Sequence, residues 1–301
     1  MFGVYFGKYL MDEGVIPEEY YYGLIEATKN SKVKMGILAV EAGLMTEEQA
    51  AEVNLLQQQQ DKKFGDIAIE KGYLSDDDVA DLLDEQGDSY LLYLQAIIES
   101  GLMDMDSFKE HLLEYRRAKK LTPNDLEAIK SGDVDRIVPV FMKDNSIPLQ
   151  VKEYVYLTSR NIVRFIDRFF RMDRVEKLTE YEAEYIAAQS LHGDSSYLTA
   201  FAGSKEGLKA IADGFVDSMS GGAKDLSYDA LDVACEFLNV NNGLYITGLS
   251  NNNVDEVTDS PIMKSEKSKI TSIGDIYKVP LYIEGSVVDL IICFNDGWSF
   301  D

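Results

Sequence analysis

Asp232, Glu236 and Asn239 place two carboxylates and an amide at spacings of four and three residues. In a helix, which turns by about 100° per residue, these side chains fall within a wedge of roughly 60° on one face. Gly243 lies on the same face and leaves room for an approaching partner. A separate apolar stripe can face a core, formed by Leu231, Ala234, Leu238, Tyr245 and Leu249. The pattern predicts a helix with a polar face that another molecule can reach.

Pro261 follows Asn239 after a spacer of 21 residues, Val240 to Ser260. The whole string, Asp-x3-Glu-x2-Asn and then Pro, resembles the signature of the CheX/CheC chemotaxis phosphatases. This resemblance implies hydrolysis of the phospho-aspartate of a CheY-like receiver domain. Glu236 would contact the receiver's active-site lysine, and Asn239 would orient the attacking water.

Positioning a water can supply much of such a catalysis, because an aspartyl phosphate is already activated. The Mg²⁺ that the reaction needs belongs to the receiver, so the resemblance implies no cofactor of the protein's own. The competing interpretation is a non-catalytic adaptor, whose exposed helix carries ordinary polar residues and only binds partners.

Composition excludes several other classes. The chain has 301 residues, a net charge of −24 and 46% hydrophobic residues. This acidity argues against nucleic-acid binding, which depends on Lys and Arg neutralising phosphates. There is no membrane-spanning apolar run and no signal peptide, so we expect a cytoplasmic protein. Cys235 and Cys293 do not have the spacing of a metal or redox motif, and His111 and His192 are too few for a histidine-rich metal site. Asp76–Asp78 lack the alternating spacing of a Ca²⁺-binding loop. No metal site is expected.

The first third of the chain repeats with a period of 29 residues. Gly14, Gly43 and Gly72 are each followed by two apolar residues, and Gly101 continues the series as a degenerate fourth unit. Each unit is typical of a short helix ended by glycine and then a second helix, because glycine tolerates the left-handed conformation at a helix end. We expect Thr46 and Ser75 to cap second helices and the acids after them to stabilise the first turn.

Units two and three resemble the MshEN domain, the N-terminal module of type II secretion and pilus ATPases. Both copies keep the motif's glycines and apolar pairs, and five residues separate them. Some MshEN domains bind cyclic di-GMP. The resemblance implies a nucleotide site near Lys34, Gly36, Gly43, Gln57, Lys63, Gly65, Gly72 and Gln86.

Lys34 and Lys63 stand where the MshEN motif has arginine, and lysine lacks the planar, stacking guanidinium. The repeated glycines and apolar pairs also serve simply to stack helices. A helical scaffold or protein-docking module is therefore the alternative to a cyclic di-GMP effector.

The fold class expected is two-domain. Residues 1–120 form an all-α module of MshEN-like helical repeats, residues 121–147 a helical connector, and residues 148–301 a CheX-like α+β domain with helices on a mostly antiparallel sheet. In the last part we expect a long helix over 151–170, strands over 179–191 and 196–202, and a terminal hairpin around Gly285. A single Glu-x2-Asn copy favours CheX over CheC, and CheX-family sheets pair in homodimers.

Overall fold

The protein is described by a computed structural model over residues 1–29, 31–60, 62–194, 196–220, 229–250, 256–295 and 297–301. It divides into two compact units, Met1–Asp133 and Val134–Asp301. The division falls inside the stretch 121–147 that the sequence assigned to a connector. Helix α9 (Pro123–Ser131) packs within unit 1, and α10 (Val134–Phe141) packs on α11 (Leu149–Phe165) within unit 2. That stretch is therefore shared between the units.

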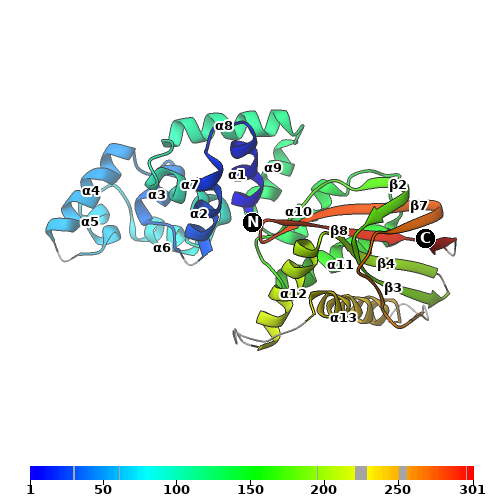
Figure 1. Cartoon of the computed structure of the whole chain (residues 1–301). Coiled ribbons are helices and arrows are strands. Elements are labelled where there is room, and N and C mark those ends of the chain that lie inside the picture. Colours follow the sequence, from blue (N-terminus) through cyan, green and yellow to red (C-terminus); the bar gives the residue numbers. More distant parts are fainter. Residues whose placement is uncertain (30, 61, 195, 221–228, 251–255, 296) are drawn as a thin grey trace. The chain divides into compact units, whose positions relative to one another are not determined.

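Unit 1 consists of helix pairs that follow the 29-residue period (Figure 1). A glycine with φ between 70° and 74° follows the first helix of each of the four pairs, at Gly14, Gly43, Gly72 and Gly101. These are left-handed helix ends that favour glycine, so the repeat and its degenerate fourth unit are confirmed. The pairs are α1 (Phe2–Asp12) with α2 (Glu18–Lys29), α3 (Met35–Glu41) with α4 (Glu47–Gln59), α5 (Phe64–Glu70) with α6 (Asp76–Asp84), and α7 (Ser89–Glu99) with α8 (Met105–Ala118).

Helix starts in unit 1 follow the expected capping residues. The Thr46 hydroxyl accepts a hydrogen bond from the Gln49 backbone N–H, and the Gln49 side-chain oxygen accepts one from the Thr46 backbone N–H. Ser75 and Asp78 form the same reciprocal arrangement at α6, where hydrogen bonds from Ser75 lower the pKa of Asp78. The acids after Ser75 thus act as helix-start charges.

Unit 2 is an α+β domain, as the sequence predicted. Within the described residues its sheet has nine strands, and every pairing is antiparallel. The order is β1-β7-β8-β4-β3-β5, with β2 and β9 also on β7 and β6 also on β3. Helices α12 and α13 pack on β3, β4 and β8, and α11 packs on α13 (Figure 1). The remaining elements are β1 (Arg171–Met172), β2 (Glu176–Ala183), β3 (Tyr185–Gly193), β4 (Ser196–Gly203), α12 (Lys205–Ser220), α13 (Ala230–Ser250), β5 (Glu256–Thr258), β6 (Ile262–Lys264), β7 (Ser268–Ile283), β8 (Ser286–Cys293) and β9 (Trp298–Phe300).

Two hairpins are present, one between the strands expected over 179–191 and 196–202 and one around Gly285. His192 pairs with Ser196 across β3 and β4, around a turn whose Ser195 lies outside the described residues. Ile283 pairs with Ser286 across β7 and β8. Glu284 and Gly285 between them have φ of 47° and 80°, the left-handed pair that closes a tight hairpin.

Two expected elements of unit 2 are corrected. The stretch 179–191 is not one strand, because β2 pairs with β7 whereas β3 turns to pair with β4. The helix expected over 151–170 ends at Phe165, where Ile166 leaves the helical conformation and Asp167 accepts a hydrogen bond from the Phe169 amide. A polar side chain that bonds the backbone two residues ahead favours a turn over a helix.

Candidate functional site on helix α13

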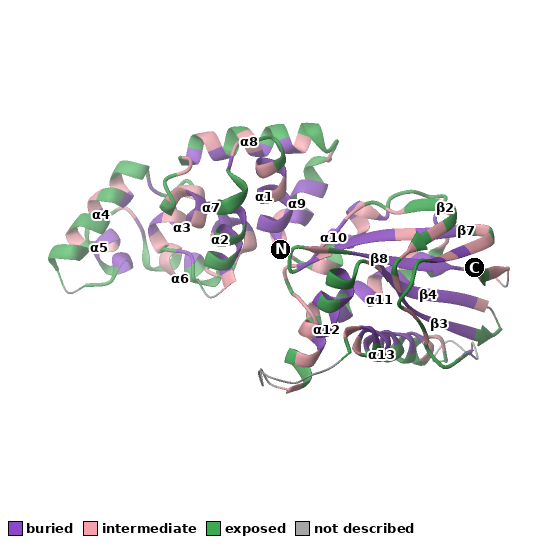
Figure 2. Cartoon of the chain, in the orientation of Figure 1, coloured by how far each residue is buried: buried purple, intermediate pink, exposed green. Residues whose placement is uncertain are grey.

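Helix α13 separates its two faces as the sequence predicted. Leu231, Ala234, Leu238 and Tyr245 are buried against the domain, and Leu249 is half-buried. The residues of the predicted polar face are all exposed (Figure 2). They are Asp232, Glu236, Asn239 and Gly243. The sequence pattern predicts that this helix starts near Ser227, a residue that lies outside the described ranges.

Aromatic packing fixes the register of α13 on the sheet. Phe237 is fully buried between Phe201 of β4 and Phe215 of α12, with ring centroids 5.5 and 5.4 Å away. About two turns further along, the ring centroid of Tyr245 lies 5.1 Å from that of Tyr154 of α11. Because these rings lock the helix about its axis, the opposite face must present Glu236 and Asn239 to the outside.

The Asn239 side chain is held by a strand residue. Gln189 of β3 donates from Nε2 to Asn239 Oδ1 at 2.9 Å and to the backbone carbonyl of Asp259 at 2.8 Å. Gln189 is only 1% exposed. The amide of Asn239 therefore lies on the surface with its oxygen tied inward.

Pro261 is brought to the same neighbourhood. The Asp259 amide donates to the Ser190 carbonyl at 3.0 Å, and the Ser190 hydroxyl donates to the Asp259 carboxylate at 2.6 Å. Pro261 follows two residues later, exposed, and β6 then pairs with β3. Through Gln189, this segment and Asn239 are linked to one strand, which gives a structural reason for the proline's place in the motif.

Glu236 has no hydrogen bond or ion pair to any residue of the described ranges, and it is exposed. On the inner side of the helix, burial raises the pKa of Cys235 to about 12, and the charges of Asp232 and Glu236 add to the effect. The thiol is thus protonated and inert at neutral pH. The reactive groups available on this helix are those of its outer face.

Gly243 has open space around it. A Cβ built there would meet nothing within 4 Å, and its carbonyl accepts a hydrogen bond from Thr247 at 2.8 Å. Val240 and Leu244 beside it are 37% and 40% exposed. This part of the helix offers an open, partly apolar surface next to the carboxylate and the amide.

Sequence reasoning missed the buried polar residues beneath this face. Asn242 donates to Gln189 Oε1 at 2.8 Å and to Thr199 Oγ1 at 3.0 Å, and it accepts from the Tyr154 hydroxyl at 2.6 Å. Asn242 and Gln189 are buried. Two signals in the sequence could have found them, because buried polar groups need partners. One is the glutamine inside the apolar run of β3, and the other is the asparagine three residues after Asn239.

Most of the residues predicted to bind a nucleotide in unit 1 take part in helix packing, helix ends or hydrogen bonds to the backbone. Gly36 and Gly65 are buried, and a Cβ would lie 3.2 Å from the Phe64 ring and 3.1 Å from Val79 respectively. Gly43 and Gly72 occupy left-handed helix ends. The side-chain amides of Gln57 and Gln86 donate to the carbonyls of Lys62 and Val33, at 3.4 and 3.3 Å. Lys63 is exposed before α5.

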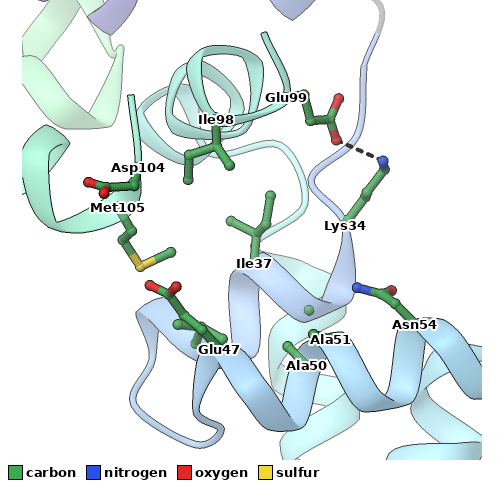
Figure 3. Close-up of a pocket in the computed structure, with 12 residues that line it drawn as sticks. Lys34, Ile37, Glu47, Ala50, Ala51, Asn54, Ile98, Glu99, Asp104 and Met105 are labelled. Atoms are coloured by element: carbon green, nitrogen blue, oxygen red, sulfur yellow. Dashed lines mark ion pairs between the residues drawn. The ribbon is translucent and has the colours of Figure 1, made fainter. Parts of the chain in front are cut away.

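A cavity of about 310 Å³ lies between α3, α4, α7 and the start of α8 (Figure 3). Of the eight nucleotide candidates, Lys34 and Gly36 line it. Lys34 Nζ is paired with Glu99 at 2.7 Å, and Glu47 and Asp104 add two further carboxylates to the lining. The walls are otherwise mainly apolar. A lining richer in carboxylates than in free cations disfavours a phosphodiester.

No helix in the described part of the chain is long and apolar enough to cross a membrane. Within the same residues, no group of three or more His, Cys, Asp or Glu side chains is arranged to hold a metal ion.

No protein-family model matches the chain, and no curated protein matches it. The C-terminal half is similar to solved CheX and CheC-like chemotaxis proteins. CheX from Desulfovibrio desulfuricans shares 12% identity, covers 48% of this chain and 99% of its own, and superimposes with a TM-score of 0.41. A chemotaxis protein from Desulfovibrio vulgaris Hildenborough shares 15% identity, covers 50% of this chain and 99% of its own, and superimposes with a TM-score of 0.40.

The CheX of a CheX–CheY complex with BeF3 and Mg from Borrelia burgdorferi shares 12% identity and covers 49% of this chain and 98% of its own, at a TM-score of 0.37. At these identities and scores the similarity does not establish an activity or a partner for this chain.

Proposed function

We propose that unit 2 is a phosphatase acting on the phospho-aspartate of a CheY-like receiver domain. The observation that carries the proposal is the pair Glu236 and Asn239, exposed together on one face of α13 at the spacing of the CheX/CheC signature. Both side chains project from a helix that aromatic packing holds rigidly. A site on a rigid element can place its groups against a docked partner reproducibly.

The reaction divides between the two proteins. The receiver supplies the aspartyl phosphate and its Mg²⁺, and Asn239 holds a water for attack on phosphorus. The oxygen of that water bonds to phosphorus as the bond to the aspartate oxygen breaks, so a free carboxylate and dihydrogen phosphate result, and the phosphate carries both protons of the water. Glu236, exposed and unpaired within the described ranges, meets a lysine of the receiver and fixes the docking geometry.

Neither role requires the side chain to take up or release a proton. Glu236 acts by attracting the receiver's lysine, and Asn239 acts by hydrogen bonding through an amide, which does not ionise. This simplicity suits a reaction in which the substrate is already activated, because what remains for the protein is orientation and exclusion of wrong water positions.

Phosphate release measures the activity directly. The full chain is mixed with a panel of CheY-like receivers charged by a small phosphodonor, and phosphate release is followed with and without Mg²⁺. Asn239→Ala should lower the turnover about a hundredfold, the cost of one positioned transition-state contact, while receiver binding persists. Asn54→Ala, which changes another exposed helical asparagine, is the matched control.

Full activity in Asn239→Ala would refute the site assignment. If the unmodified chain binds phosphorylated receivers yet releases no phosphate from any of them, the adaptor interpretation replaces the enzyme. Binding alone also serves that interpretation, so turnover decides between the two.

A further inference from the structure

We propose that Gln189 is a positioning residue, which fixes the Asn239 amide in the one orientation that points its N–H donors toward the bound partner. This inference rests on the proposed phosphatase function. It adds to the predicted pair a residue that is remote in sequence and buried under the helix, and that no part of the Glu-x2-Asn signature contains.

The orientation of Gln189 follows from the chemistry of its partners. The backbone carbonyl of Asp259 is purely an acceptor, so the Gln189 atom 2.8 Å from it must be the Nε2 donor. On the other side, Oε1 accepts from Asn242 Nδ2 at 2.8 Å. A reversed amide would set two acceptors against each other and two donors against each other. Gln189 therefore has a single favourable orientation.

Asn239 inherits its orientation from Gln189. Because Nε2 of Gln189 is the group that faces Asn239, the asparagine must present Oδ1 inward, at 2.9 Å. Turning the Asn239 amide over would replace this hydrogen bond by two opposed N–H groups next to a buried strand, where an unmade hydrogen bond is costly. Nδ2 and its two hydrogens consequently point away from Gln189, on the exposed side of α13.

Gln189 itself is held by a buried network. Asn242 is fully buried and bonds Gln189, Thr199 and Tyr154. Burial raises the pKa of Tyr154 to about 12, so its hydroxyl keeps the proton that it donates to Asn242 Oδ1. A network whose members are all satisfied is rigid. The amide of Asn239 is thus connected through Gln189 to the inside of the domain.

This orientation selects how a water is held. A water that accepts a hydrogen bond from Asn239 Nδ2 uses one lone pair and retains the other for attack on phosphorus. An asparagine with its oxygen outward would instead bind a water hydrogen and leave the direction of the lone pairs less constrained. Gln189 therefore acts on the rate of the chemical step, through Asn239, and not on receiver docking.

The test compares two buried substitutions in the full chain. Gln189→Met removes the donor to Asn239 at similar volume. Thr158→Val removes a different buried contact to α13, the hydrogen bond that Asn241 Nδ2 donates to Thr158 at 3.0 Å, and does not touch Gln189. Both should lose stability. Only Gln189→Met should lower kcat for phosphate release, by about tenfold, with KM for the receiver unchanged.

A double mutant separates positioning from a general structural loss. If Gln189 acts through Asn239, then Gln189→Met combined with Asn239→Ala should be no slower than Asn239→Ala alone. A further tenfold drop in the double mutant would overturn the proposal, as would equal losses of kcat in Gln189→Met and Thr158→Val.

NMR of the unmodified chain tests the orientation even if Gln189→Met does not fold. The side-chain NH2 signal of Asn239, assigned by its loss in Asn239→Ala, should show an order parameter close to that of the rigid backbone. The NH2 group of exposed Asn54 should be much more mobile. Equal mobility of the two overturns the proposal. No phosphate release by the unmodified chain overturns the proposed function together with the positioning role, whereas release that Gln189→Met leaves unchanged overturns the positioning role alone.

Discussion

Glycines of α3 and α5 in unit 1 and of α13 in unit 2 occupy opposite environments. A Cβ on Gly36 or Gly65 would press on Phe64 or Val79, whereas one on Gly243 would meet open space. Glycine in a helix weakens it by about 1 kcal/mol relative to alanine. In unit 1 that loss is offset by close packing of helices, and on α13 no packing within the described residues offsets it.

The polar residues of the two regions differ in the same way. In unit 1, Lys34 pairs with Glu99, and Gln86 bonds the backbone of Val33. On α13, Glu236 has no such partner in the described ranges. The lesson is that a conspicuous motif residue counts toward function only after its structural role has been sought. By this criterion α13 is the stronger functional candidate.

Glu236→Ala should have an effect as large as that of Asn239→Ala. Loss of the charge that meets the receiver's lysine should lower kcat/KM for phosphate release by roughly a hundredfold, with part of the loss in affinity and part in rate. Stability should not change, because the side chain is exposed. Glu110→Ala, an exposed acid of α8 in unit 1, controls for the change in net charge. Kinetics at two salt concentrations provide the measurement.

Added salt should weaken the unmodified protein's docking more than that of Glu236→Ala, since screening acts on the charge pair. An equal salt response in both would remove Glu236 from the docking contact. It would also remove the contrast between the acid of α13, which has no partner within the described ranges, and the paired side chains of unit 1.

Gly36→Val should destabilise unit 1 by about 2 kcal/mol. The new Cβ would stand 3.2 Å from the Phe64 ring, and its two methyl groups have less room still. Gly23→Val on α2 is the matched control, because a Cβ there meets nothing within 4 Å. Urea unfolding followed by circular dichroism measures both. Equal stability of the two variants would show that the repeat glycine is not there for packing.

Restoring arginine at Lys34 and Lys63 tests the nucleotide site proposed for unit 1. For the unmodified chain we expect micromolar affinity for cyclic di-GMP at best, a binding free energy near roughly −8 kcal/mol. The double Lys→Arg variant should bind about tenfold more tightly, because a guanidinium group stacks on bases and forms bidentate hydrogen bonds with phosphate. Titration calorimetry on the full chain measures both.

Glu99→Gln is the companion variant, since it releases Lys34 from its ion pair. If neither the unmodified chain nor the arginine variant binds, the repeats are a scaffold and the lysines are ordinary surface charges. Tight binding by the unmodified chain would instead break the contrast between the units.

Local signals in the sequence predicted much of this architecture. The glycine period gave the helix pairs of unit 1, since each left-handed end needs a residue without a side chain. Spacing placed Glu236 and Asn239 on one exposed face, and Gly285 marked the last hairpin. These inferences needed only helical geometry and turn chemistry.

Long-range contacts could not be read from the sequence. Gln189 and Asn239 are 50 residues apart in the sequence, and only the packing of α13 on β3 brings them together. The break of 179–191 into two strands depends likewise on β2 finding β7, about a hundred residues later. The packing role of Gly36 required knowing that Phe64 of the next unit lies against it.

Gly243→Ala has the smallest expected effect and two opposite signs. Alanine should stabilise α13 by about 1 kcal/mol, because helix propensity improves and the added methyl group meets no atom within 4 Å. The same methyl stands on the face with Glu236 and Asn239, so it should weaken receiver docking a few-fold by holding the partner's surface away. Thermal unfolding and receiver titration are measured on one preparation. A gain in stability with unchanged docking would mean that no partner surface comes close to Gly243. The docking face would then have to lie elsewhere on α13. A gain in stability with weaker docking would show that the helix gives up stability for a bare surface, which the packed glycines of unit 1 do not do.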